Sequence, residues 1–421
     1  MERIQEPRLK SWEEISSRLA FLGFCAWSLA IPFAQVQKIR FTAISIFIII
    51  GAFLIFLPGK TSLRRIGKGV SPFLFIFCLI GILPLLDFWR WENPRMAMDS
   101  FVLRLPMIVL PFILYQFSFY WPPFWKIIII SCLITSSLIN VVYFSSQGLD
   151  LIYSSIRNDI DHLSIRYITS RPYYGFLLGI CFFSLVYIYK NKINILLITA
   201  LIFFTLFEYL IVGKLFLVSS FICFTIYILY IIRNNLNLII LYFAIFAFTT
   251  GFIINKIVKT QAYFELTNQG GFDFSTIPKH YSNSINSRLI LWKASKDILY
   301  ENNAWIFGLG TQNFQDKLDS SVQKYNPYLS EQHLTSHNLF LGFWMQYGLM
   351  GLSVLIFMFG IFFKESISKK NISLFLLSTF LLLSVQTEIY MDREMGVHLF
   401  IWVLVVLYLP IDSTQKNKLS T

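Results

Sequence analysis

Four side chains in this sequence have types and positions that suit chemistry on a negatively charged substrate. His337 stands where a long polar segment meets an apolar run, and an imidazole at such a boundary can accept a proton near neutral pH. Arg288, Lys214 and Arg171 carry fixed positive charges. Cations bind a diphosphate and stabilise it as it leaves, while a base deprotonates the attacking hydroxyl. Together the four residues suit an acidic lipid-linked substrate such as a polyprenyl pyrophosphate.

Three of these residues also have structural interpretations that the sequence leaves open. His337 could cap a helix at the lipid–water boundary, and Arg288 could be a surface cation that extends its charged end toward the headgroups. Lys214 lies one or two helical turns from Glu208. Charges at membrane depth are costly and are usually functional or paired, so Lys214 and Glu208 either form a structural ion pair or take part in the chemistry.

The sequence gives little sign of a metal site or of another cofactor. Asp159 and Asp161 flank Ile160 and could mimic a metal-binding pair, but a cluster of Arg and Lys side chains makes a metal unnecessary. The five cysteines lie in apolar runs, where a thiol behaves as a small hydrophobe, and their spacing suits neither a metal site nor a disulfide framework. We therefore expect no metal and no cofactor.

The elements that position these residues belong to a chain whose solvent is mostly lipid. Of its 421 residues, 56% are apolar and only 14% are charged, compared with about 25% charged residues in a soluble domain. This composition excludes a soluble enzyme, a disordered protein and a coiled coil. Apolar runs of about 20 residues, the length that crosses a bilayer, recur along the whole chain. They predict an all-α, polytopic integral membrane protein with about 12 transmembrane helices. The runs are 19–36, 41–59, 69–86, 105–125, 127–149, 172–189, 193–213, 215–232, 234–255, 338–363, 371–387 and 395–411.

The distribution of basic residues predicts how the chain crosses the membrane. An even number of spans puts both termini on one side. When that side is the cytoplasm, the inner segments hold more Lys and Arg than the short outer loops, Arg104 among the latter, as the positive-inside rule requires. The net charge of +12 then reflects scattered basic residues, and we expect no nucleic acid as partner. The chain divides into membrane helices over 1–255, a long outer loop over 256–336, and membrane helices over 337–421.

The outer loop shows the pattern of two amphipathic helices. Apolar residues recur at helical spacing over 288–300, after a capping signal at Asn286 and Ser287. Gly308-Leu309-Gly310 predicts a turn, and a second short helix is expected over 313–324. Two helices of this kind can lie over the outer membrane surface as a lid.

Three passages of the chain together resemble the O-antigen ligase/polymerase family of bacterial envelope membrane proteins. Their order, the number of spans and the long loop before the His-Asn motif all agree with that family. The passages are 286–310, with Arg288, Trp292 and the Gly308-Leu309-Gly310 turn; 336–351, with His337, Asn338, Gly348 and Gly351; and 388–397, with Glu388, Arg393 and Gly396.

The resemblance implies a GT-C-like helical fold in the bacterial inner membrane and an active site at its periplasmic face. It implies transfer of a glycan from undecaprenyl pyrophosphate to an acceptor sugar such as lipid A-core, with inversion and without a metal, in lipopolysaccharide biosynthesis. It also implies binding to membrane lipids.

The resemblance assigns the family's loop arginine to Arg288 and its histidine to His337. A second family arginine corresponds to Lys214, which keeps the charge but loses the fork that matches phosphate. Gln346 stands where many members carry an acid. Asn338, Glu208 and Glu388 are candidates for supporting roles. Arg171, at the outer end of a predicted span, is a further candidate for binding the diphosphate.

Other functions remain open at this point. A repeat-unit polymerase of the same family uses a growing saccharide as acceptor, and the sequence scarcely separates it from a ligase; we expect the ligase. A transporter of lipid-linked oligosaccharides would need cations along a central cavity and repeated groups of spans, and the sequence shows neither pattern. A membrane protein with a purely structural role is the third alternative.

Overall fold

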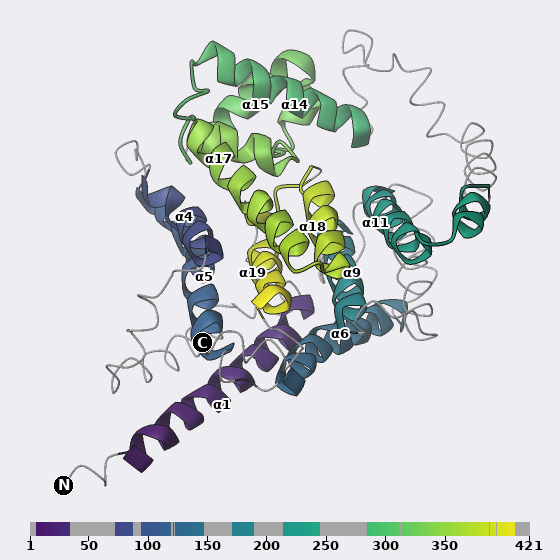
Figure 1. The fold of residues 1–421 in the computed structure, drawn as a ribbon. Coiled ribbons are helices and arrows are strands. Elements are labelled where there is room, and N and C mark those ends of the chain that lie inside the picture. The colour runs from purple at the N-terminus through teal and green to yellow at the C-terminus, as the bar shows by residue number, and fades with distance from the viewer. Residues whose placement is uncertain are drawn as a thin grey trace.

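The computed structural model describes residues 6–33, 72–86, 94–118, 121, 123–146, 171–188, 214–244, 284–311, 313–386, 388–392 and 394–408. Every regular element within these ranges is a helix, which confirms the expected all-helical class for this part of the chain (Figure 1). The expected runs 41–59 and 193–213 lie outside the described residues, as do Glu208 and the Asp159–Asp161 pair.

Within the described residues, nine helices form an apolar bundle, and three further helices, which precede α17 in the sequence, form a separate loop subdomain. The helices of the bundle are α1 (Glu6–Ala30), α4 (Pro72–Leu86), α5 (Pro94–Ser118), α6 (Pro123–Ser146), α9 (Arg171–Ile188), α11 (Lys214–Ile232), α17 (Leu339–Ser368), α18 (Ile372–Ser384) and α19 (Glu394–Tyr408), with the short turns η1 (Ile31–Phe33) and η3 (Tyr390–Asp392); residues 236–244 are also helical. The helices of the loop subdomain are α14 (Ser284–Glu301), α15 (Phe314–Tyr325) and α16 (Pro327–Ser330).

Each apolar run that falls within the described ranges coincides with a helix. Helix α17 is the one described helix that is both long and apolar enough to cross a membrane, while α1, α4, α6, α9, α11 and α18 contain shorter apolar stretches. The total of about 12 transmembrane helices stays a prediction.

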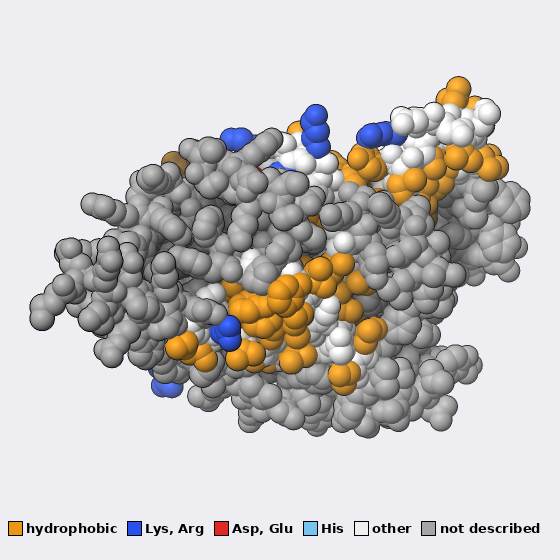
Figure 2. All heavy atoms as spheres, turned by 60° about the horizontal axis from the view of Figure 1, so that its bottom comes forward, with side chains coloured by type: hydrophobic (Ala, Val, Ile, Leu, Met, Phe, Trp, Pro, Cys, Tyr) orange, Lys and Arg blue, Asp and Glu red, His pale blue; other side chains and the backbone are white. Residues whose placement is uncertain are grey.

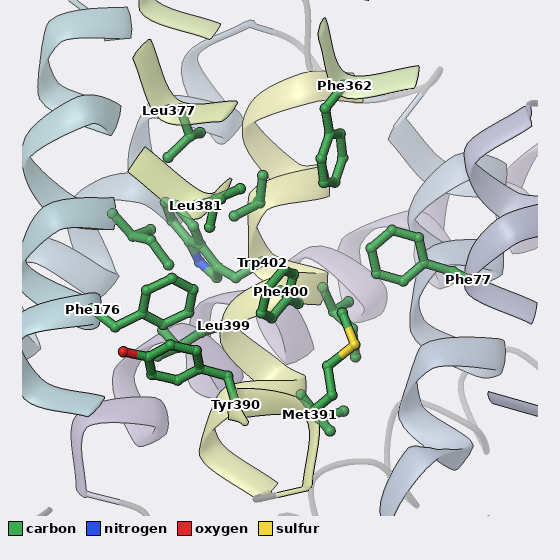
Figure 3. Packing of buried hydrophobic residues seen from close by; sticks show 14 of the residues in the cluster. Phe77, Phe176, Phe362, Leu377, Leu381, Tyr390, Met391, Leu399, Phe400 and Trp402 are labelled. Carbon is green, nitrogen blue, oxygen red and sulfur yellow. The ribbon is translucent and has the colours of Figure 1, made fainter. Parts of the chain in front are cut away.

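Aromatic side chains fill the centre of the bundle around α19. Trp402 and Phe400 of α19 lie between Phe176 of α9 on one side and Phe77 of α4 on the other (Figure 3). The Phe176 ring stacks on Tyr390 with 4.2 Å between the ring centroids. This packing fixes α9 against the segment that joins α18 to α19.

The outer surface of the bundle is also apolar. Leu22 of α1, Phe75 of α4 and Phe357 of α17 are all exposed. Figure 2 shows hydrophobic side chains gathered across the middle of one face, with few Lys or Arg side chains among them. A soluble monomer rarely exposes so much apolar surface, and such a surface is typical of a protein in contact with lipid.

The loop subdomain has a hydrophobic core of its own. The predicted helices over 288–300 and 313–324 are confirmed as α14 and α15, which pack against each other at one end of α17 (Figure 1). Their shared core contains Leu291, Ile298 and Leu318, and Met345 of α17 also belongs to it. Met345 therefore joins the loop subdomain to the bundle.

Helix α17 is broken at Gly348, where φ is 65° and ψ is −152°. Only glycine adopts this conformation readily. The break is pressed against the turn that follows α14: a Cβ atom on Gly348 would lie 2.0 Å from Ile306 O, and one on Gly308 would lie 2.5 Å from Gly348 N. The expected turn at Gly308 and Gly310 is present, with φ of 72° and 87°.

The turn supplies hydrogen-bond partners for the backbone groups that the break exposes. A helix interruption frees N–H and C=O groups, which at membrane depth must find partners within the protein. Three backbone hydrogen bonds provide them: Leu309 N donates to Met345 O (2.7 Å), Gly310 N donates to Gln346 O (3.0 Å) and Leu349 N donates to Ile306 O (2.9 Å).

Candidate active site

His337 forms a close pair with Glu388. His337 Nδ1 lies 3.0 Å from Glu388 Oε2, and the two side chains are 22% and 13% exposed. The backbone N–H of Ile389 donates to the other carboxylate oxygen, Oε1, at 3.1 Å. The carboxylate is thereby held in place from both sides, and it in turn fixes the orientation of the imidazole.

Asn338 holds the first turn of α17 against the end of α18. Its side-chain oxygen accepts a hydrogen bond from Leu341 N at 3.1 Å, which caps the helix. Its amide nitrogen donates to Gln386 Oε1 at 3.2 Å. His337 precedes this cap with φ of 46°, a left-handed conformation. The cap therefore sets the direction in which His337 leaves the helix.

Arg288 of α14 lies near the same carboxylate. Burial lowers the pKa of Arg288, and the charges of Glu388 and Tyr390 partly oppose that effect. Burial raises the pKa of Glu388, but the hydrogen bond and charge of His337, the Ile389 N–H and the charge of Arg288 outweigh it and hold the pKa below its ordinary value. The carboxylate is therefore charged at neutral pH.

The segment that carries Glu388 rests on the first turns of α9. Tyr173 donates a hydrogen bond from its hydroxyl to Ile389 O at 3.3 Å, and its ring meets the edge of the Tyr390 ring. Burial raises the pKa of Tyr390 well above its ordinary value. Arg171 begins α9, two residues before Tyr173.

The predicted residues are brought together in part. Arg288, His337, Asn338 and Glu388 gather around one point although they come from three separate stretches of chain. Lys214 begins α11, but its side chain and that of Arg171 lie outside the described part of the structure, as does the whole of Glu208. Their grouping with Arg288 stays a prediction.

A second polar cluster, which the sequence did not reveal, lies beside this group. Arg104 was expected in a short outer loop; this is wrong, because α5 begins at Pro94 and carries Arg104 inside it, where it is 2% exposed. Its Nη2 atom lies 2.6 Å from Asp392 Oδ1 and 3.2 Å from Gln346 Oε1. Its Nη1 atom donates to the Tyr347 hydroxyl.

The signal for this cluster was present in the chain but pointed to no partner. The predicted apolar run 105–125 begins directly after Arg104, because a charge usually ends a span. Charges at membrane depth are paired with one another, and Asp392 is the acid that pairs with Arg104. The two residues are far apart in the sequence, so spacing alone could not join them.

The described residues contain no group of three or more His, Cys, Asp or Glu side chains arranged to hold a metal ion. What they do provide is a carboxylate-bound imidazole with an arginine beside the carboxylate. Such a group can remove a proton from a hydroxyl and bind an anion at the same place.

Comparison with known proteins agrees with these features. Residues 163–356 match the family model described as O-Antigen ligase, whereas no curated protein matches the chain. The matched segment contains Arg288, His337 and Gln346 and ends within α17, before Glu388 and Asp392. Over residues 163–356 the chain is therefore similar to the O-antigen ligase family, which supports the resemblance that the sequence motifs indicate.

Proposed function

We propose that this protein transfers a preassembled O-antigen glycan from undecaprenyl pyrophosphate to an acceptor sugar, lipid A-core, at the periplasmic face of the inner membrane. The observation that carries the proposal is the contact of 3.0 Å between His337 Nδ1 and Glu388 Oε2, with Arg288 acting on the same carboxylate. The family match supports the reaction class.

His337 serves as the general base in this proposal. When its Nδ1–H donates to Glu388, the lone pair on Nε2 is the one that accepts a proton. Nε2 removes the proton from the acceptor hydroxyl, whose oxygen then forms a bond to the anomeric carbon of the donor glycan. The bond between that carbon and the diphosphate oxygen breaks, and its electrons leave with the undecaprenyl pyrophosphate. Attack opposite the leaving group inverts the anomeric centre.

Glu388 stabilises the imidazolium that this proton transfer creates, and the cations stabilise the leaving group. A charged carboxylate on Nδ1 fixes the tautomer and balances the new positive charge. Arg288 offers a planar fork to two phosphate oxygens. Lys214 and Arg171 complete the binding of the diphosphate, and three fixed cations do the electrostatic work for which other transferases use a divalent metal.

The first test compares two histidines that share an unusual backbone conformation. His337 and His333 have φ of 46° and 48°, and asparagine tolerates this region well. His337→Asn is expected to reduce transfer from a purified undecaprenyl-pyrophosphate-linked glycan to lipid A-core by at least ~100-fold. His333→Asn, on the same loop but paired with Asp319, is the matched control and should keep full activity. Wild-type transfer by a folded His337→Asn protein would remove His337 from the mechanism.

A second test separates the ligase from a repeat-unit polymerase, which would use the same base and cations on a different acceptor. Deletion of the gene is expected to leave lipid A-core without any polymer on a lipopolysaccharide gel, while lipid-linked polymer persists. A core that carries a single repeat unit would instead identify a polymerase.

A further inference from the structure

We propose that Arg104 is a positioning residue that holds the two sides of this active site at a fixed distance from each other. It acts on Glu388 through Asp392, and on the loop that carries Arg288 through Gln346. The inference rests on the proposed function, because the effect assigned to Arg104 is an effect on the same transfer reaction.

The first connection runs to the segment that carries Glu388. Arg104 binds Asp392, the last residue of η3, with a contact of 2.6 Å. Asp392 N donates to Ile389 O at 3.2 Å, so the residues from Glu388 to Asp392 form a single short turn. Movement of Asp392 would therefore move the carboxylate that orients His337.

The second connection runs to the loop subdomain. Arg104 donates to Gln346 Oε1 at 3.2 Å, and Gln346 Nε2 donates to Asp392 Oδ2 at 3.0 Å, so the three side chains form a closed triangle. The backbone oxygen of Gln346 accepts the hydrogen bond from Gly310 N at 3.0 Å. Gly310 ends the turn that follows α14, the helix of Arg288.

The surroundings of the guanidinium fix its orientation. Arg104 also donates to the Tyr347 hydroxyl, and its central carbon lies 4.9 Å from the centroid of the Phe343 ring. Lysine, with a single ammonium group, could not reach Asp392, Gln346 and Tyr347 at once. The planar fork of arginine joins α5, α17 and η3 in one arrangement.

The burial of this ion pair favours a role in geometry over a role in stability. Arg104 is 2% exposed and Asp392 is 20% exposed. A buried ion pair is often no more stabilising than apolar residues of the same volume, because both charges must leave water. Its directional hydrogen bonds, in contrast, specify one relative position of the three elements. In this protein, that relative position sets the distance between Arg288 and the His337–Glu388 pair.

The variant that tests this inference replaces both charges together. Arg104→Gln with Asp392→Asn leaves no unpaired charge inside the bundle, which makes a folded protein attainable. The control is Trp27→Phe, which removes a buried hydrogen bond of 3.0 Å to His398 Nδ1 and none of the contacts of Arg104. Both proteins, the wild type and His337→Asn are reconstituted in liposomes as full chains.

Two measurements are made on each protein. The first is kcat and KM for an undecaprenyl-pyrophosphate-linked glycan with lipid A-core as acceptor. For the double variant we expect kcat to fall on the order of 100-fold, because small misplacements of reacting groups slow a reaction by about this much. KM for the donor should change by less than about threefold, because Arg288 is retained.

The second measurement is hydrogen exchange of backbone amides, which should become faster in 306–311 and 388–392 and stay unchanged in α15. Trp27→Phe should alter neither kcat nor these two segments.

The outcomes separate this inference from the proposed function. Unchanged kcat per folded molecule in the double variant, or faster exchange throughout the protein, would show that Arg104 only stabilises the fold and would overturn the inference. If His337→Asn is inactive in the same experiment, the proposed function survives that result. If His337→Asn transfers glycan as the wild type does, the proposed function fails, and a rise in exchange confined to 306–311 and 388–392 would still support the connection through Arg104.

Discussion

Glu388 is a charged residue in a largely enclosed place, and its charge depends on its neighbours. Burial alone would raise its pKa, yet His337, the Ile389 N–H and Arg288 together lower it. As the pH falls, the unfolded chain therefore takes up this proton before the folded protein does. The charge of Glu388 contributes fully to the free energy of unfolding above about pH 4.3, the ordinary pKa of a glutamate. This contribution is lost as the pH falls through the lower pKa of the folded state.

Glu388→Gln tests this dependence and the mechanism at once. At pH 7 we expect a lower Tm than the wild type in thermal unfolding of the detergent-solubilised protein. The difference should begin to narrow as the pH falls through about 4.3, the ordinary pKa of a glutamate, and should close once the pH is below the lower pKa of the folded state. We also expect kcat to fall on the order of 100-fold, because the amide cannot balance the charge of the imidazolium. A gap in Tm that stays constant down to pH 3 would contradict the ionised state of Glu388.

Single residues were predictable where chemistry singled them out. His337, Arg288 and Glu388 were named from their types and from the resemblance, and the structure brings them together. Arg104 was missed because its meaning lies in a contact with Asp392, and an arginine among apolar residues looks like the end of a span. Pairing across a fold is set by packing, which a single sequence does not reveal.

At the scale of elements, the break in α17 brings the loop and the bundle together. The hydrogen bonds of Met345 O, Gln346 O and Leu349 N all go to the turn 306–310. We call this contact between the break in α17 and the turn 306–310 the seam. It requires glycine on both sides, because a Cβ atom on Gly308 or Gly348 would meet backbone atoms of the other segment. Because the turn 306–310 follows α14, the break helps to hold α14, the helix of Arg288, against α17.

Gly348→Ala is expected to open this seam. The backbone conformation alone costs a non-glycine residue on the order of 1–3 kcal/mol, and the added Cβ would lie 2.0 Å from Ile306 O. Hydrogen exchange at Leu309 and Gly310 should accelerate, and glycan transfer should fall. Gly360→Ala in the same helix is the matched control: its Cβ meets nothing within 4 Å, so it should be neutral or stabilising by up to ~1 kcal/mol. Equal behaviour of the two variants would refute the seam.

The helices themselves were largely predictable, and the break was not. Apolar runs identified α4, α9, α18 and α19 to within a few residues, because lipid requires continuous apolar length. Gly348 and Gly351 looked alike in the sequence, since glycine is common in membrane helices. Only the approach of Ile306 and Gly308 distinguishes the one that interrupts α17.

At the scale of the whole molecule, α17 connects two bodies with separate cores. The apolar bundle packs around its lower part, and the loop subdomain packs on Met345 near its start. The piece of α17 that follows the break at Gly348 and ends at Ser368 rises about 30 Å, which matches the thickness of a bilayer core. The loop subdomain and the turn between α17 and α18 should therefore lie on opposite sides of the membrane.

Labelling of introduced thiols tests this orientation. Ser320 of α15 and Lys370 of the turn between α17 and α18 are both exposed. Ser320→Cys is expected to react with a membrane-impermeant maleimide added to cells whose outer membrane has been permeabilised, and Lys370→Cys only after the inner membrane is disrupted, because the basic turn stays in the cytoplasm. The parent protein, with its five native cysteines, gives the background. The reverse labelling would place the active site in the cytoplasm and exclude the proposed reaction.

The interruption in α17 also constrains biogenesis. The backbone groups that the break in α17 leaves unpaired find their partners in the turn 306–310, which is synthesised before α17. In the proposed orientation this turn must first cross to the outer side of the membrane. Insertion of α17 into lipid is thus incomplete until that stretch has been translocated and has folded back. If the proposed function and orientation hold, export of the loop and assembly of the catalytic site become one event, and a molecule halted during translocation should be inactive.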